Sequence, residues 1–332
     1  MSKTVSKCAS NATSRRNSFS WIFTCYLLIA CSPVGFGCRS TKNEFYPEAD
    51  KSHNDDLISL VSELWELDGA QIRPGTDYKL NLQGKLEKRI QGDKAKDRLF
   101  TSVKWSTIRR APTVSEFLKL LDNYEPVVGI SEELTIEKQL EVDAFLDAVI
   151  KTPVMRRTHQ FLVDRGLSKH DLEQFKQQLF SIWFEPYKRR RSRDSSAFEH
   201  VFVGEQGYNQ LLGLHNWIQF AEQEAQNKID YQGYYATCGT PGGLATVSFR
   251  LPSGLVKPRT SFPIGTTPAF EMALYTATFL TSDQRPQSVR LGPCTVTVQC
   301  HSLRNTKKMG TCYLQLPGVE TKLPGTGEDE TD

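Results

Sequence analysis

The sequence predicts an α+β fold, in which a mostly helical first half is followed by a second half with several short strands. In the first half, apolar residues recur at the spacing of one helix face from about residue 55 to residue 182. In the second half the apolar period changes to two in four segments, 247–251, 289–291, 296–298 and 312–316. Because helices and strands do not alternate as regular βαβ units, the pattern favours α+β over a parallel α/β sheet.

Five helices are expected in the first half. Thr113 and Glu116 form a capping-box pattern. Thr152-Pro153 supplies a cap and a first turn, and Gly166 supplies a stop. The expected helices lie at 55–65, 113–121, 133–151, 152–166 and 168–182.

Two further helices are expected in the second half, at about 208–226 and from 267 to 279. The first of them would carry His215. The segment around His200 is expected to run as a strand, then a turn, and then this helix.

The amino-acid composition restricts the class of protein only broadly. The chain has 332 residues, 39% of them hydrophobic and 24% charged, which is ordinary for a soluble globular protein. A formal net charge of +3 is too small to argue for nucleic acid by itself, and it excludes no nucleic-acid partner, since local patches matter more than the sum.

The two ends of the chain differ from its middle. Arg15 and Arg16 precede an apolar run at 19–30, which predicts a secretory signal peptide within residues 1–38. An uncleaved signal anchor extending through Gly37 is the alternative. The first reading places the protein outside the cell or in the endomembrane lumen, and the second tethers it to a membrane. A polar linker is expected at 39–52, and an acidic disordered tail at 320–332.

Four of the eight cysteines lie in the last third of the chain and show no paired zinc-binding spacing. Cys294 and Cys300 share one predicted strand, which would separate them by roughly 20 Å and prevent a bridge between them. Cys300 and Cys312 lie on opposite arms of a plausible hairpin, so they could form a disulfide in an oxidising compartment. The alternative is that all four, Cys238 included, are small buried thiols.

Two of the six histidines, His200 and His215, lie close together in the sequence, and the first is bracketed by Glu199 and Glu205. Such a pair suits acid–base chemistry, because only histidine has an unperturbed pKa near neutral pH. His159 and His170 fall on predicted helices of the first half and are interpreted as structural or surface residues.

Several segments, in order, resemble the EndoU family of poly(U)-preferring endoribonucleases. The segments are ELWELDGAQIRPGTDYKLNLQGK (63–85), SSAFEHVFVGE (195–205), GLHNWIQF (213–220), GLVKP (254–258) and GTTPAFEMALYT (265–276). The resemblance implies one endoribonuclease domain over 53–319, with a helical N-terminal part and a two-lobed catalytic region of small antiparallel sheets flanked by helices.

The resemblance also implies the reaction. A ribose 2′-hydroxyl of single-stranded, U-containing RNA attacks its own phosphate, giving a 2′,3′-cyclic phosphate and a 5′-hydroxyl end. Carried over by motif, His215 is the base, His200 the acid and Lys257 the cation that stabilises the phosphorane. The protein is expected to act as a monomer. The competing readings are a non-catalytic RNA-binding protein, or a secreted interaction protein, on the same fold.

Glu199 and Glu205 match positions that support catalysis in the family. The resemblance implies a divalent cation, Mn²⁺ first and Ca²⁺ second, and these carboxylates are its candidate ligands. The alternative is that Glu199 orients a histidine while Glu205 caps the following helix.

Thr311 and Tyr313 resemble the family's Thr-x-Tyr element at the base site. Tyr313 would stack on uracil and Thr311 would hydrogen-bond its edge, whereas the alternative for Tyr313 is a half-buried strand residue. The two lie on one face of a strand, opposite the apolar side chains of Cys312 and Leu314.

The basic run 188–193 (KRRRSR) precedes the His200 segment. It could bind RNA phosphates, or it could be an exposed loop or a processing site. Thr267 and Ala269 depart from the family's GTSPEFE-like run, where serine and glutamate are expected; the hydroxyl is kept and the carboxylate is lost.

Overall fold

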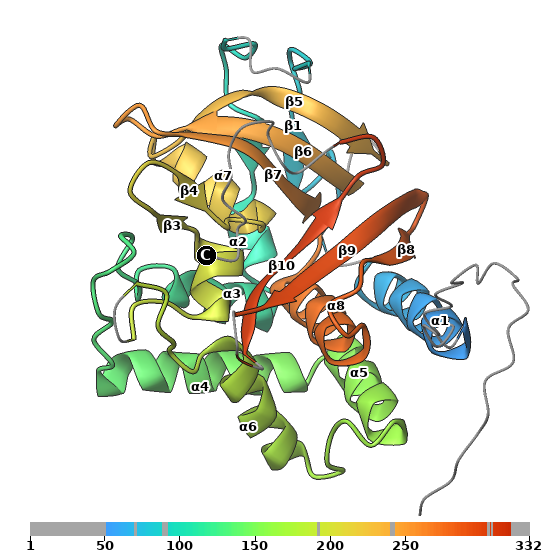
Figure 1. Ribbon diagram of the computed structural model, residues 1–332. Helices are drawn as coiled ribbons and strands as arrows, with labels where there is room; N and C mark the ends of the chain where they lie inside the picture. The colour runs from blue at the N-terminus through green and yellow to red at the C-terminus, as the bar shows by residue number, and fades with distance from the viewer. Residues whose placement is uncertain are drawn as a thin grey trace, which may run out of the picture. The chain divides into compact units, whose positions relative to one another are not determined.

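The computed structural model describes residues 51–69, 72–87, 92–190, 193–239, 243–303, 306 and 308–319 (Figure 1). The predicted signal segment and the predicted acidic tail lie outside the described residues. Most of the predicted linker does too, and only its last residues, 51 and 52, are described. Within the described part, no helix is both long and apolar enough to cross a membrane.

The described residues form an α+β arrangement, as expected. The α-helices are α1 (Lys51–Asp68), α2 (Trp105–Ile108), α3 (Pro112–Leu120), α4 (Ile136–Ile150), α5 (Pro153–Asp164), α6 (Leu172–Trp183), α7 (Trp217–Ala225) and α8 (Pro268–Thr281). The strands are β1 (Tyr78–Leu80), β2 (Phe100–Val103), β3 (Glu205–Gln206), β4 (Leu211–Leu212), β5 (Asp230–Cys238), β6 (Gly243–Arg250), β7 (Val256–Ile264), β8 (Gln287–Leu291), β9 (Cys294–Ser302) and β10 (Met309–Gln315).

Side-chain caps explain where several helices begin. The Thr152 hydroxyl accepts a hydrogen bond from Met155 N at 3.2 Å, and Pro153 occupies the first turn of α5, as predicted. Two predicted starts are wrong. Helix α3 begins at Pro112 without a side-chain cap, so Thr113 already lies inside it. Helix α6 begins after Asp171, whose carboxylate caps it, and not at Ser168.

All strand pairs within the sheets are antiparallel, in the orders β5-β6-β7, β10-β9-β8, β1-β2 and β3-β4. Helix α8 packs against β9 and β10, and α1 packs against β8 (Figure 1). Strands β5 and β7 were not predicted, and Leu251 lies beyond the end of β6. Strand β6 lacks the expected alternation because it is buried on both faces from Gly243 to Phe249.

Two disulfides join the strands. Cys300 and Cys312 are register partners on β9 and β10 and are bonded, which confirms the predicted hairpin bridge. Cys238 and Cys294 form a second disulfide, which the sequence analysis missed. This bridge joins the end of β5 to the start of β9 and so links two separate sheets.

An aromatic cluster ties the His200 segment to the helical first half. The Phe198 and Phe202 rings stack with centroids 5.0 Å apart. Phe117 of α3 contacts both, and Phe184 stacks on Phe198 with centroids 4.6 Å apart. Because these rings are buried, the cluster fixes the backbone between them, where His200 lies.

Candidate active site

His200 lies in a short π-helix, η1 (Glu199–Val203), and not in the predicted strand. Gly204 N donates to Glu199 O at 2.8 Å, closing the five-residue spacing that defines this turn. Valines and phenylalanines favour strands in isolation. Here the rings of Phe198 and Phe202 stack with centroids 5.0 Å apart, whereas four residues of a strand would separate them by about 13 Å. Single π-helical turns of this kind are frequent at functional sites.

The backbone of the second histidine pairs directly with this turn. Leu214 N donates to His200 O at 3.0 Å, and His215 N donates to Val201 O at 2.7 Å. Gly213 has a φ of +63°, and a Cβ atom there would lie 1.7 Å from His200 O. Leu214 has a φ of +58°, which is uncommon for a leucine. Glycine at 213 therefore permits the close approach of the two histidine segments.

His215 precedes a helix and does not lie on one, so the predicted 208–226 helix is wrong at its start. Helix α7 begins at Trp217, and the Asn216 side chain caps it by accepting from Gln219 N at 2.9 Å. The Asn216 amide also donates to Glu271 of α8 at 2.8 Å. His215 is thus held between a strained turn and a capped helix.

A buried carboxylate holds His200. Nδ1 of His200 lies 2.8 Å from Oε2 of Glu205, and both side chains are fully buried. The guanidinium of Arg189 lies 3.3 Å from the same oxygen. Burial alone would raise the pKa of Glu205, but the hydrogen bond from His200 and the charge of Arg189 outweigh it and lower that pKa. An ionised carboxylate only accepts hydrogen bonds, so Nδ1 of His200 is the donor.

Glu199 has the opposite character. Burial, and then the negative charges of Glu205 and Glu132, raise the pKa of Glu199 well above its usual range. The two carboxylates of this buried site therefore differ: the lowered pKa of Glu205 favours its ionised form, and the raised pKa of Glu199 favours its protonated form. Glu205, in β3, is therefore the residue that orients His200, whereas the alternative considered above gave that role to Glu199.

The two glutamates do not fit a cation site well. Hard divalent cations take about six or more oxygen ligands, whereas the described residues contain no group of three His, Cys, Asp or Glu side chains that could hold a metal. One oxygen of Glu205 already contacts His200 and the positively charged Arg189, whose charge opposes a second cation at that place.

A neutral hydroxyl holds His215. Nδ1 of His215 lies 3.1 Å from the hydroxyl oxygen of Thr260, and that hydroxyl donates to Leu214 O. Since the hydroxyl proton is used on the carbonyl, Thr260 accepts from Nδ1–H of His215. Nε2 of the neutral ring is then the basic nitrogen. Thr260 was not predicted as a site residue.

Strand β7 carries the predicted cation, Lys257, together with Thr260. Lys257 and Thr260 lie three residues apart on β7, and both are buried. The register between β6 and β7 shifts between Val247 and Phe249, beside these residues. A buried ammonium on the strand that also orients His215 fits the predicted phosphate role.

Strand β10 carries Thr311 and Tyr313, the two residues predicted to bind the base. The Tyr313 ring stacks on His215 with centroids 5.4 Å apart and is half-buried. Thr311 is fully buried, so the expectation of an open Thr–Tyr face is wrong for this residue. Its hydroxyl oxygen has no hydrogen-bond partner among the residues that the structure describes. Strand β10 also packs against η1 and β7, so three elements converge on the histidines.

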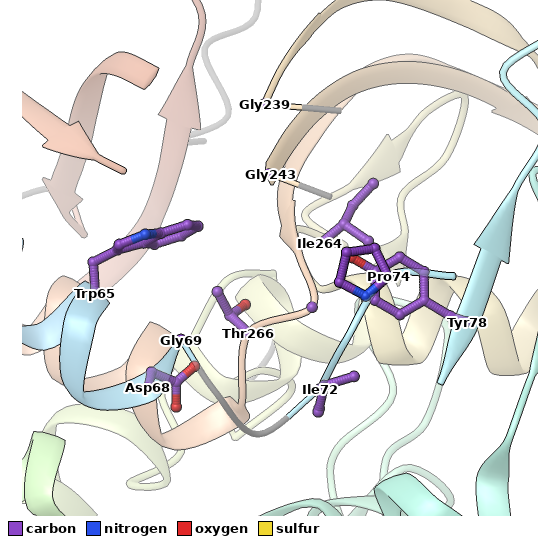
Figure 2. Close-up of a pocket in the computed structure, with 11 residues that line it drawn as sticks. Trp65, Asp68, Gly69, Ile72, Pro74, Tyr78, Gly239, Gly243, Ile264 and Thr266 are labelled. Carbon is purple, nitrogen blue, oxygen red and sulfur yellow. The ribbon is translucent and has the colours of Figure 1, made fainter. Parts of the chain in front are cut away.

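Other candidates lie elsewhere. His159 is structural, as expected: its ring stacks on Phe175 with centroids 4.4 Å apart, and its Nε2 lies 2.7 Å from Lys169 O. A cavity of about 270 Å³ beside the end of α1 (Figure 2) is lined by residues that include Trp65, Asp68 and Tyr78. It is lined by none of the predicted site residues.

The region combines two histidines with different supporting partners, a lysine buried on the strand that carries Thr260, and a half-buried tyrosine stacked on His215, which are residue types suited to acid–base cleavage of RNA. The family model "Endoribonuclease XendoU" matches residues 56–314, and the chain belongs to this family.

The similar proteins carry consistent descriptions. The chain is 41% identical over 277 residues to a "Uridylate-specific endoribonuclease C" of Danio rerio, covering 79% of this chain and 89% of that protein. It is 37% identical over 273 residues to a "Poly(U)-specific endoribonuclease" of Xenopus tropicalis, covering 78% and 93%. A solved structure of XendoU, described as a snoRNA processing endoribonuclease, superimposes with a TM-score of 0.71 at 37% identity, covering 80% of this chain and 99% of that one.

Proposed function

We propose that this protein is an endoribonuclease that cleaves single-stranded RNA at uridylates and leaves 2′,3′-cyclic phosphate and 5′-hydroxyl ends. Membership of the XendoU family and the descriptions of its relatives support this function. One observation carries the mechanism: His200 is held by a carboxylate, whereas His215 is held by a neutral hydroxyl.

The different partners assign the two proton transfers. The ionised Glu205 favours the protonated form of His200, so Nε2–H of His200 donates to the departing 5′-oxygen. The Thr260 hydroxyl places no negative charge beside His215, so Nε2 of this ring takes the proton from the attacking 2′-hydroxyl. The P–O bond to the 5′-oxygen breaks as the bond to the 2′-oxygen forms, and exchange with water then restores both histidines.

Lys257 and the Thr311–Tyr313 pair complete the site. The ammonium of Lys257 stabilises the extra negative charge of the phosphorane. Tyr313 offers a ring for stacking on uracil beside His215. The Thr311 hydroxyl is buried and has no hydrogen-bond partner among the described residues, so it can donate to the base edge only if RNA binding uncovers it. Since all these side chains come from one chain, a monomer is sufficient for the reaction.

A cation requirement, for Mn²⁺ or else Ca²⁺, stays a prediction from the family resemblance. Because the Glu199–Glu205 pair does not fit a cation, no step is assigned to a metal bound there. Cleavage measured after chelation, and again after Mn²⁺ or Ca²⁺ is restored, tests this requirement.

We further propose that the protein works in an oxidising compartment, either secreted or in the endomembrane lumen. The two disulfides among the described residues support this location. The alternative is a membrane tether through residues 19–37. N-terminal sequencing of the protein recovered from the medium and from membranes distinguishes cleavage of the leader from its retention.

The test of the function uses two matched RNA oligonucleotides, one with a single uridine and one with cytidine in its place. The purified protein should cut the first after the uridine and leave a cyclic phosphate, and His215→Ala should abolish the cut. Intact RNA with and without manganese would instead favour a non-catalytic protein on this fold.

A further inference from the structure

One arginine of the basic run does not lie on the surface. Lys188 and Arg190 are exposed, but the side chain of Arg189 is only 2% exposed. The loop is closed by the pairing of Tyr187 with Ser195, and Asp194 accepts hydrogen bonds from the backbone N–H of Arg189 at 2.7 Å and of Arg190 at 2.8 Å. This closed loop directs Arg189 inward, so a phosphate-binding role does not apply to it.

The guanidinium of Arg189 contacts two parts of the site at once. Its Nε lies 3.3 Å from Oε2 of Glu205, the oxygen that also accepts from His200. Its Nη2 donates to Gly310 O at 3.3 Å and to the Tyr187 hydroxyl at 3.0 Å. Gly310 immediately precedes Thr311 on β10.

We propose that Arg189 is a positioning residue that fixes the acid, through Glu205, and the base-recognition strand, through Gly310, in one arrangement. This inference rests on the proposed function and adds a residue that neither the motif resemblance nor the histidine pattern indicated. A planar guanidinium can make both contacts at fixed separation, whereas a lysine ammonium is a single point charge.

Each contact has its own kinetic consequence. Without a positive neighbour the buried Glu205 carboxylate is uncompensated, and His200 loses its fixed orientation, which lowers kcat. Without the donor at Gly310 O, β10 loses a restraint next to Thr311 and Tyr313, which raises KM for uridine substrates. A displacement of about 1 Å in such a site costs about 100-fold in rate.

The test compares Arg189→Met with Arg189→Lys, using kcat and KM for the single-uridine RNA. Arg189→Met should lower kcat by about 100-fold and raise KM. Arg189→Lys should restore most of kcat, because it keeps a charge beside Glu205, but should leave KM raised, because the contact with Gly310 is lost. Arg190→Met, which removes an exposed charge from the same loop, should leave kcat unchanged.

A double variant tests whether Arg189 affects His200 through Glu205. If Arg189 acts on His200 through Glu205, then Arg189→Met combined with Glu205→Gln should have about the kcat of Glu205→Gln alone. Thermal melting establishes that each variant is folded, and Arg189→Lys supplies the comparison if Arg189→Met does not fold.

The inference is overturned if folded Arg189→Lys has the kcat and KM of the wild type, or if the kcat losses in the double variant multiply. If the wild-type protein cleaves uridine RNA, neither of these two results affects the proposed function. Absence of cleavage by the wild type would overturn the proposed function itself.

Discussion

Nδ1 of His200 lies 2.8 Å from Oε2 of Glu205, and solvent reaches neither side chain. In this geometry the carboxylate fixes which ring nitrogen carries the proton and where the other nitrogen points. Glu199 begins the same π-helical turn, five residues before Gly204, and is buried as well, but its pKa is raised and not lowered. The two glutamates therefore have different roles, although the sequence presents them as a symmetrical pair around one histidine.

The first prediction separates these glutamates. Glu205→Gln removes the charge that favours protonated His200, so kcat should fall by about 100-fold or more. Glu199→Gln replaces a carboxyl whose raised pKa already favours the neutral form, so kcat should change little. Steady-state cleavage at saturating RNA measures both, and a larger loss for Glu199→Gln would refute the assignment.

The second prediction concerns the glycine at the crossing of the histidine segments. Gly213→Ala should destabilise the fold by more than the roughly 1–2 kcal/mol that a left-handed residue costs, because its Cβ would meet His200 O at 1.7 Å. Gly166→Ala is a matched control, since Gly166 also has a positive φ (+67°) but no heavy atom within 4 Å of the added Cβ. Urea unfolding measures both, and equal losses would show that the contact is unimportant.

The third prediction concerns the hairpin disulfide beside the base site. Cys300 and Cys312 are 12 residues apart, and replacing both with serine should lower the unfolding free energy by about 3 kcal/mol. Cys238 and Cys294 are 56 residues apart, so the same replacement there should cost about 4 kcal/mol. Chemical denaturation of the two double variants provides the comparison. Unchanged stability in both would argue against the bonds.

The fourth prediction is a pH dependence of stability. Asp68 accepts from Thr267 N at 2.8 Å at the start of α8, and burial raises its pKa from 3.8 to about 6. The folded state therefore holds this proton over a range where the unfolded state has lost it. The stability that this group contributes is fully present below about pH 3.8 and is lost as the pH rises through about 6.

Asp68→Asn removes this titration, so the stability difference between wild type and variant should shift against the wild type by about 2 kcal/mol between pH 4 and pH 7. Urea unfolding at several pH values measures the shift. A difference that stays constant with pH would contradict the assigned titration of Asp68.

Features of the fold that depend on a few neighbouring residues could be predicted from the sequence. Helices with a threonine cap followed by proline were placed correctly at Pro153 and at Pro268, because cap chemistry acts within a few residues. The His200 segment was mistaken for a strand, since its β-favouring residues are recruited into a π-helix by aromatic packing from α3 and from the end of α6.

The supporting residues could not be found from local pattern. Thr260 lies 45 residues from its partner His215, and Cys238 lies 56 residues from Cys294. Neither spacing carries a signal in a single sequence. Arg189 was visible only as part of a basic run, and its burial depends on a loop closed by Tyr187 and Ser195.

The order of the two proton transfers is tested most directly with a uridine 3′-phosphodiester whose leaving group is a nitrophenolate, which departs without protonation. If His200 is the acid and His215 the base, His200→Ala should lose RNA cleavage but keep most of the wild-type rate on this ester, whereas His215→Ala should lose both activities. Retention of ester cleavage by His215→Ala, with its loss in His200→Ala, would contradict the account.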